Sequence, residues 1–324
     1  MNRDLTWIRE IRKEMALEIV VQTIVPILLL IGIGFLSRKT EIMKAGDERV
    51  LSAYVYYVAL PALFLITMSE TAFTFEVLNF IFAGIVPILV AVAILTSLYV
   101  VFRFKKSVFF LLLISTIFGS LAFFGIPFIT LAFPIEGERL STLSAASIAL
   151  VSVTISLIVF ELYGLEESTI KNGAQHVIKR LARNPLVLSI LVGLFLSITG
   201  IGIPHPISLA LHMLGRTTSI VAIFMLGVFL YGKQYVNVAD AFKLGLLRVV
   251  FLPVVALLTI KILGLSGVEG MVVVLMHSMP AAISMIVLSE RYDFYKETVA
   301  SLILISSITA ALYLNLWLIL LGAF

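Results

Sequence analysis

The sequence contains no cysteine and few charged residues, and both deficits exclude classes of function. Without thiols, disulfides, iron–sulfur clusters and thiolate metal sites are ruled out. The sequence also lacks a His-Glu-x-x-His segment and a phosphate-binding glycine loop. Aspartates occur only outside the long apolar runs, at Asp4, Asp47, Asp240 and Asp293, so paired-aspartate chemistry inside a membrane is excluded. We therefore expect no enzyme, no cofactor and no metal site.

Apolar residues are in large excess. Hydrophobic residues make up 61% of the chain and charged residues 13%, with a mean hydropathy of +1.14; soluble domains have roughly 45–50% apolar and about 25% charged residues. A membrane-spanning helix needs about 20 mostly apolar residues. Runs of this kind fall at 18–37, 48–68, 78–102, 107–133, 141–164, 184–203, 207–232, 241–264, 268–289 and 297–322. The sequence therefore predicts an all-α membrane protein with ten transmembrane helices.

Basic residues gather on alternate connections, and this predicts the orientation. Lys and Arg accumulate on the cytoplasmic side of membrane proteins. With the N-terminus outside, and apart from the N-terminal lead, whose basic residues alternate with acidic ones, only Arg139 lies in an outside connection. The inside connections then contain Arg38, Lys39, Lys44, Arg49, Arg103, Lys105, Lys106, Lys171, Lys179, Arg180, Arg183, Lys233, Lys243, Arg291 and Lys296. We predict a multi-pass protein of the cell (plasma) membrane with both termini extracellular. This asymmetry, rather than binding to nucleic acid, explains the net charge of +4.

An internal duplication is suggested by similar segments in the two halves. The predicted first and sixth spans contain Pro26 and Pro185, and each carries glycine at the same distance from its proline, at Gly34 and Gly193. Five spans per half is an odd number, so a duplicated half would insert in the opposite orientation, as in many secondary transporters. We divide the chain into a first five-helix repeat (1–164), a cytoplasmic linker (165–183) and a second, inverted five-helix repeat (184–324).

The predicted fourth and ninth spans carry helix-breaking residues in corresponding positions. Gly125 and Pro127 lie in the fourth span and Pro280 in the ninth. Proline removes a backbone donor and clashes with the preceding turn, and the freed carbonyl groups cannot remain unpaired against lipid. Interrupted segments that correspond in two halves point to the binding site of a transporter. Two ordinary proline kinks are the alternative.

Ionisable side chains within spans are costly and thus candidates for function. Glu161, Arg248 and Lys261 lie near predicted span ends, where they could reach the interface by snorkelling, so we expect a structural role for them. Arg216 lies nine residues beyond Ile207, roughly 13 Å into the bilayer core. Its guanidinium fits a carboxylate. It is therefore a candidate for binding an anion, with pairing inside the protein as the alternative.

Polar side chains near the two breaks are further candidates. His277 could couple transport to protons or donate to a substrate, because imidazole titrates near physiological pH; a packed, satisfied histidine is the alternative. Hydroxyl groups could face a ligand or bond back to their own helix, and those near the breaks belong to Ser115, Thr116, Ser120, Ser278 and Ser284.

Helix N-termini at the breaks could attract an anion without any charged side chain. Such termini present unpaired N–H groups and the positive end of the helix dipole. We expect the second half of the fourth span to start near Gly125 and that of the ninth near Ala281. With the side chains above, the candidate site consists of Ser115, Thr116, Ser120, Gly125, Pro127, Arg216, His277, Ser278, Pro280 and Ser284.

Several short segments together resemble the auxin efflux carrier family, which includes plant auxin exporters and microbial permeases for small carboxylates. In order, they are Ala59-Leu-Pro61-Ala-Leu-Phe, Phe123-Phe-Gly125-Ile-Pro127, Arg183-Asn184-Pro185-Leu, Phe224-Met-Leu-Gly227, and Met279-Pro280 followed by Leu288-Ser-Glu-Arg-Tyr292. The resemblance covers essentially the whole chain. Two departures are Ser120, where the family often has Asn, and the absence of the long hydrophilic central loop of many plant exporters. The second departure favours the microbial permease branch.

The resemblance implies a fold and a function. The fold would consist of two inverted five-helix repeats whose broken helices 4 and 9 cross at mid-membrane. The crossing unit would move like an elevator against a scaffold of helices 1, 2, 6 and 7, and the protein would be a homodimer. We expect a secondary active transporter for a small organic anion, such as a dicarboxylate or an auxin-like acid, possible coupling ions being protons or sodium. The alternative is a sodium-coupled symporter of the bile-acid-carrier type, which should show more carboxylate or amide ligands near the breaks.

Overall fold

The computed structural model describes residues 25–164, 181–232, 237–283 and 293–322, together with residues 179, 285 and 289. Within these residues the chain is helical and forms no β-strand, apart from one isolated β-bridge between Gly119 and Ala281. The predicted all-α class is thus confirmed for the part of the chain that the structure describes.

The helices follow the predicted apolar runs closely. The first described helix covers residues 25–39. The named elements after it are α2 (Asp47–Tyr54), η1 (Val55–Ala59), α3 (Leu60–Ser69), α4 (Phe75–Phe102), α5 (Lys106–Ile117), η2 (Leu121–Gly125), α6 (Ile126–Ala132), α7 (Gly137–Gly164), α9 (Pro185–Thr199), α10 (His205–Leu230), α11 (Val238–Leu246), η3 (Leu247–Phe251), α12 (Leu252–Leu263), α13 (Gly267–His277) and α15 (Lys296–Leu320). The elements named η are single π-helical turns.

Five of the described helices are long and apolar enough to cross a membrane on their own. They cover Asp47–Ser69, Phe75–Phe102, Gly137–Phe160, His205–Leu230 and Val238–Leu263. A sixth candidate is the pair Lys296–Ala310 and Leu312–Leu320, which is bent by 53°. The remaining apolar helices are shorter, and two of them, α5 and α13, end where the sequence predicts an interrupted span.

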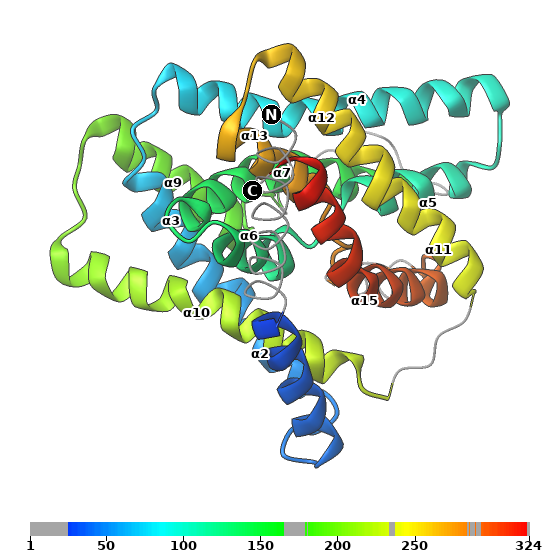
Figure 1. The fold of residues 1–324 in the computed structure, drawn as a ribbon, viewed down its shortest axis with the longest axis horizontal. Coiled ribbons are helices and arrows are strands. Elements are labelled where there is room, and N and C mark those ends of the chain that lie inside the picture. Colours follow the sequence, from blue (N-terminus) through cyan, green and yellow to red (C-terminus); the bar gives the residue numbers. More distant parts are fainter. Residues whose placement is uncertain are drawn as a thin grey trace, which may run out of the picture.

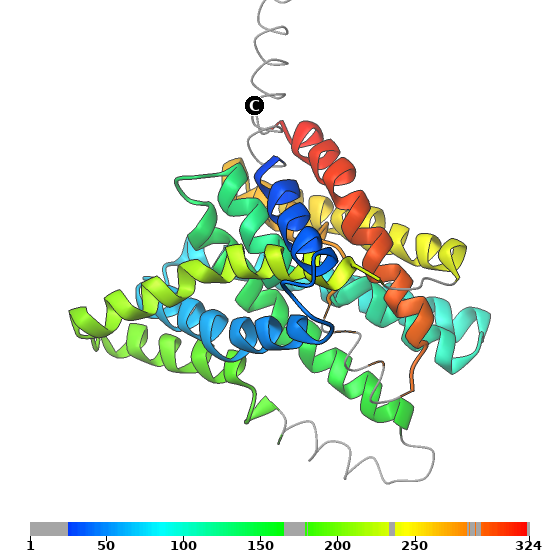
Figure 2. The ribbon, with the colours of Figure 1, turned by 90° about the horizontal axis from the view of Figure 1, so that it is seen from below.

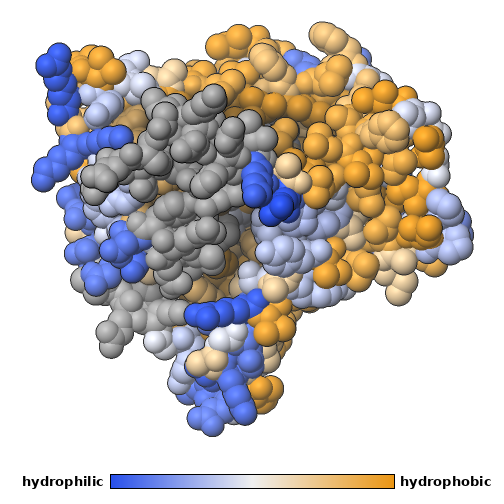
Figure 3. All heavy atoms as spheres, turned by 180° about the vertical axis from the view of Figure 1, so that it is seen from behind, coloured by the Kyte–Doolittle hydropathy of each residue, from blue (hydrophilic) through white to orange (hydrophobic). Residues whose placement is uncertain are grey.

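The outer surface is apolar to an extent that suits lipid rather than water. Large side chains such as Phe102, Ile262 and Leu312 are 70%, 84% and 72% exposed, and Figure 3 shows a broad hydrophobic area over the upper right of this face. A helix that is apolar on its inner and outer faces is typical of a membrane span. The surface therefore agrees with a multi-pass membrane protein.

One set of helices packs together through glycines. This set, the scaffold group, consists of the helix at 25–39, α2, η1, α3, α9 and α10. A Cβ atom on Gly34 would lie 2.1 Å from the carbonyl oxygen of Phe224 in α10, and one on Gly193 would lie 2.6 Å from that of Leu65 in α3. Small residues let membrane helices approach closely. Glycine is thus required at both crossings.

The other helices form a second set around the interrupted spans. This broken-helix group consists of α4, α5, η2, α6, α7, α11, η3, α12, α13 and α15, in which α4 packs on α5, α7 and α12, while α11 packs on α15. Figures 1 and 2 show the two groups side by side, with α3, α9 and α10 on one flank and α5, α11, α12 and α15 on the other. The groups meet chiefly where α10 contacts η2 and α6, and where α3 contacts α7.

Each π-helical turn precedes a proline. Pro61, Pro127 and Pro253 are the second residues of α3, α6 and α12, and each of these helices follows directly on a π-turn. Proline within a helix clashes with the carbonyl group four residues earlier, and a π-turn widens the backbone locally. The chain therefore passes these prolines without interrupting the helix.

Candidate functional site

The fourth and ninth predicted spans are both interrupted, and the interruptions contact each other. After α5 ends at Ile117, residues 118–120 are not helical, and after α13 ends at His277 the chain is extended around Pro280. Ser120 N donates to Pro280 O over 2.8 Å, and Ala282 N donates to Phe118 O over 3.0 Å. These two bonds form an antiparallel bridge at Gly119 and Ala281. We call residues 118–120 and 279–282 the joint.

The break in the fourth span lies earlier than the sequence predicts. We expected the second half to start near Gly125, but η2 begins at Leu121 and continues directly into α6. Pro127 does not break the helix because η2 accommodates it, as described above. The prediction that the helix starts near Gly125 is therefore wrong by about one turn. In the ninth span, Ala281 N donates to Ser306 Oγ over 3.1 Å, and residues 284 and 286–288 of that span lie outside the described part of the chain.

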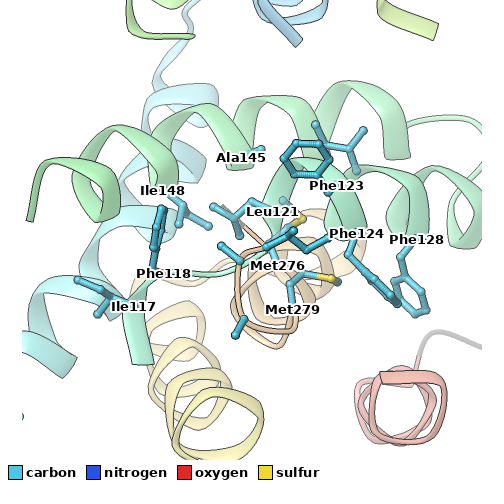
Figure 4. Packing of buried hydrophobic residues seen from close by; sticks show 14 of the residues in the cluster. Ile117, Phe118, Leu121, Phe123, Phe124, Phe128, Ala145, Ile148, Met276 and Met279 are labelled. Atoms are coloured by element: carbon cyan, nitrogen blue, oxygen red, sulfur yellow. The ribbon is translucent and has the colours of Figure 1, made fainter. Parts of the chain in front are cut away.

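Gly125 and Pro127 instead shape the contact between the broken helices. A Cβ atom on Gly125 would lie 2.9 Å from Met276 Sδ and 3.1 Å from Met279 Cγ. Figure 4 shows the two methionines beside Leu121 and Phe124 in this packing. Gly125 thus lets the helix after the joint close onto the end of α13, and Pro127 is buried one turn into that helix.

Four of the predicted hydroxyl residues, Ser115, Thr116, Ser120 and Ser278, are buried at or next to the joint, but three of them bond to their own helices. Ser115 Oγ donates to Leu111 O over 2.6 Å, Thr116 Oγ1 to Leu112 O over 2.7 Å, and Ser278 Oγ to Val274 O over 2.9 Å. Hydroxyls that bond back in this way are satisfied locally. Ser120 contributes its backbone, because its N–H bonds to Pro280 and its carbonyl accepts from Phe124 and Gly125.

His277 is the last residue of α13 and is completely buried. Its Nδ1 donates to Val273 O over 2.7 Å. Its Nε2 is buried without a hydrogen bond, and the imidazole lies near the backbone of Gly84 in α4. One ring nitrogen is therefore held by its own helix, and the other has no partner in the described protein.

Two predicted residues are not brought to the joint by the described structure. Arg216 is exposed on α10, beside Gly215, which packs on Leu63. Ser284 lies outside the described residues. The other candidates, which belong to α5, η2, α6, α13 and the non-helical residues between these elements, lie at or next to the joint.

Arg248 is the cation at the joint, and the expectation that it snorkels to the interface is wrong. Its exposed fraction is 0%. Its Nε donates to Met279 O over 2.8 Å and its Nη1 donates to Thr116 O over 2.7 Å, so one side chain connects both broken helices. Helix α11 begins at Val238, which places Arg248 ten residues into the span. The depth argument that singled out Arg216 therefore applied to Arg248 as well. Lys261, by contrast, is exposed at the end of α12, and the side chain of Glu161 lies outside the described part.

A cavity of about 110 Å³ lies between the scaffold group and the broken-helix group, next to the helix that follows the joint. Its lining is apolar except for Ser307 and includes Ile31, Phe124, Phe128, Leu226 and Leu230. In Figure 4, Phe124 and Phe128 lie on the side of their helix that faces α15. The cavity could hold a small apolar group. Among the described residues, no cluster of three or more His, Asp or Glu side chains could hold a metal ion.

Comparison with known proteins gives a consistent result. The family model described as "Membrane transport protein" matches residues 19–318. An uncharacterized transporter of Methanocaldococcus jannaschii is 22% identical over 299 residues, covering 90% of this chain and 95% of that protein. The uncharacterized transporter YfdV of Escherichia coli is 22% identical over 306 residues, covering 91% and 95%. The chain belongs to this family of membrane transporters, the auxin efflux carrier family that its sequence resembles.

Proposed function

We propose that the protein is a secondary active transporter that moves a small organic anion across the cell membrane by elevator-type alternating access. The observation that carries this proposal is the joint. The helix Leu121–Ala132 starts there, with Leu121 N donating to Gly119 O over 2.9 Å, so the positive end of its dipole lies at the break. An anion bound at this terminus would lie where the two broken helices meet.

The proposed architecture is ten spans arranged as two inverted repeats. Its support comes from packing that corresponds between the halves. The helix at 25–39 closes on α10 at Gly34, and α9 closes on α3 at Gly193. The helix at 25–39 and α9 are the first spans of the two halves, and α3 and α10 are the second spans. In each crossing the first span of one half packs on the second span of the other half, as expected for a duplicated chain. The joint pairs the fourth span of each half in the same way.

The proposed movement is that of the broken-helix group against the scaffold group. Each group is packed within itself, and the contacts between them are concentrated at α10 with η2 and α6, and at α3 with α7. A boundary of this kind suits a rigid-body shift. The apolar cavity at this boundary would receive the hydrocarbon part of the anion, one helical turn from its carboxylate.

We extend the proposal to the polar residues and to the assembly. Ser115, Thr116, Ser120, Gly125, Pro127, His277, Ser278, Pro280 and Ser284 would line or shape the substrate site, and Arg216 would attract the anion. His277 could serve proton coupling, and sodium remains the other candidate coupling ion. The protein would be a homodimer with both termini outside.

Counterflow in proteoliposomes tests the proposed function. The purified protein is reconstituted into proteoliposomes that are preloaded with an unlabelled carboxylate. Uptake of labelled monocarboxylates and dicarboxylates is then measured under imposed pH, sodium and voltage gradients. We expect uptake by the wild type and a large loss in Pro280→Ala, with a smaller loss in Arg216→Ala. Pro204→Ala, which changes the N-cap of α10, is the matched proline control.

Full counterflow in both Pro280→Ala and Arg216→Ala, with the fold retained, would remove the site assignment. Uptake that requires a sodium gradient and ignores pH would favour the sodium-coupled alternative.

A further inference from the structure

Arg248 carries hydrogen-bonding capacity that the described protein leaves unused. It lies in the π-turn η3 and is completely buried. Its Nε and Nη1 donate to the carbonyl groups of Met279 and Thr116, whereas its Nη2 is buried without a partner. A buried guanidinium nitrogen without an acceptor points to a ligand that supplies one.

The charge of Arg248 is also uncompensated within the described residues. The ion pairs there involve His212 with Glu70, Lys243 with Asp240 and Lys296 with Asp293. The titratable groups close to Arg248 are His277 and Tyr313, and neither type of side chain is an anion at neutral pH. The span 106–132 contains no acidic residue. A cation removed from water requires a counter-charge.

The free nitrogen lies at the joint itself. A Cβ atom on Gly119 would be 1.6 Å from Arg248 Nη2, so the guanidinium packs directly on the backbone of this glycine. Gly119 is two residues before the start of η2, whose N-terminus faces the break. The free nitrogen and the positive end of the helix Leu121–Ala132 thus lie at the same place. Together they make this the part of the described molecule best suited to a carboxylate.

We propose that Arg248 binds the carboxylate of the transported anion through Nη2, so that the cargo is the counter-ion of this buried guanidinium. This inference rests on the proposed function and narrows it to a singly charged anion. Because Arg248 bonds to both broken helices, its charge moves with the joint. The carrier loaded with a monocarboxylate then moves no net charge at this site, and the empty carrier moves one positive charge.

Voltage dependence tests the proposal in the wild-type protein. In proteoliposomes, membrane potentials are set with potassium gradients and valinomycin. We expect one-for-one exchange of a monocarboxylate to be insensitive to the potential, and net uptake to depend on it. Exchange of the monocarboxylate that changes with voltage overturns the proposal, even if no variant can be purified.

Variants at position 248 provide a second test of the proposal. Arg248→Gln should raise the apparent KM for the monocarboxylate about 10- to 100-fold, because a charged hydrogen bond is lost, and should make exchange sensitive to voltage. Arg248→Lys should keep exchange insensitive to voltage. Lys261→Gln is the matched control, since it removes an exposed cation from the same span. Wild-type KM and voltage behaviour in Arg248→Gln would overturn the proposal while leaving the transport function intact. A wild type that carries no anion at all would remove both.

Discussion

At the scale of single residues, the joint depends on a position without a side chain. The guanidinium of Arg248 occupies the space that a Cβ atom on Gly119 would take. Because Arg248 is held by the backbone oxygens of Thr116 in α5 and Met279 in the joint, it cannot retreat without losing both bonds. The smallest possible addition at Gly119 therefore disturbs three segments at once.

Gly119→Ala should accordingly destabilise the protein. Overpacking of a dense core costs about 1–3 kcal/mol, and lost bonds to the charged side chain add to this. The melting temperature in detergent should fall by several degrees. Gly245→Ala is the control, because the nearest atom to a Cβ there is a Leu302 methyl group at 3.8 Å. Equal melting temperatures for the two variants would show that the guanidinium is not fixed against Gly119.

Proximity along the chain was enough to select small and polar residues near the breaks, and their role in substrate binding stays a prediction. Ser115 and Thr116, the farthest of these residues, lie twelve and eleven positions before Pro127, and the others lie nearer to Pro127 or Pro280. Arg248 was missed because its contacts, Thr116 and Met279, are distant in sequence and its span begins three residues earlier than predicted. Arg216 and Arg248 lie at similar distances from the ends of their spans, so the sequence does not distinguish them. The packing of the helices leaves Arg216 exposed and buries Arg248.

At the scale of elements, three prolines, Pro61, Pro127 and Pro253, follow π-turns. Pro253 has no N–H group to reach the carbonyl of Val249, four residues earlier. Trp317 Nε1 of α15 donates to that oxygen over 2.9 Å. The hydrogen bond from Trp317 in α15 thus replaces the bond that the backbone N–H of residue 253 would make within its own helix. This also explains the misplaced break, since a proline that follows a π-turn does not end its helix.

Trp317→Phe should leave the carbonyl of Val249 without its donor. A buried polar group left unpaired costs about 1–3 kcal/mol. Pro253→Ala restores an N–H group at position 253, so we expect Trp317→Phe to cost less in that background than in the wild type. Thermal unfolding of the four proteins in this double-mutant cycle measures the coupling. Identical losses in both backgrounds would contradict a role for Trp317 as the substitute donor.

At the scale of the whole molecule, the two helix groups meet at an apolar boundary that contains the cavity. The absence of cysteine provides a clean background for cross-linking this boundary. Leu63→Cys with Gly215→Cys lies within the scaffold group, where the two Cβ atoms would be 3.3 Å apart, close to disulfide geometry. Phe128→Cys with Leu230→Cys lies across the boundary, since both residues line the cavity.

Oxidation of the first pair should leave counterflow unchanged, because in the proposed movement it joins two helices of the same rigid group. Bridging the second pair with a short, reducible thiol reagent should abolish counterflow, and reduction should restore it. The reduced form of each pair serves as its own control. Undiminished counterflow in the bridged second pair would rule out relative movement of the two groups at this boundary.

Hydropathy was enough to locate the described helices, because apolar runs and helices coincide along the chain. The grouping of those helices depended on contacts that no local pattern contains, such as Gly34 on Phe224 and Gly193 on Leu65. The repeated glycine in the first and sixth spans was visible in the sequence. Its meaning as a close helix crossing required the partner helix to be known.

The joint also affects how the chain must be made. The N–H group of Ser120 finds its acceptor at Pro280, 160 residues further along the chain. At about 5–20 residues per second, roughly 8 to 30 s separate the synthesis of the two. During that interval the first half cannot complete its own backbone pairing at residues 118–120. The early helices therefore enter the membrane before their backbone pairing is complete. The hydrogen bonds of the joint can form only after the predicted ninth span has been translated.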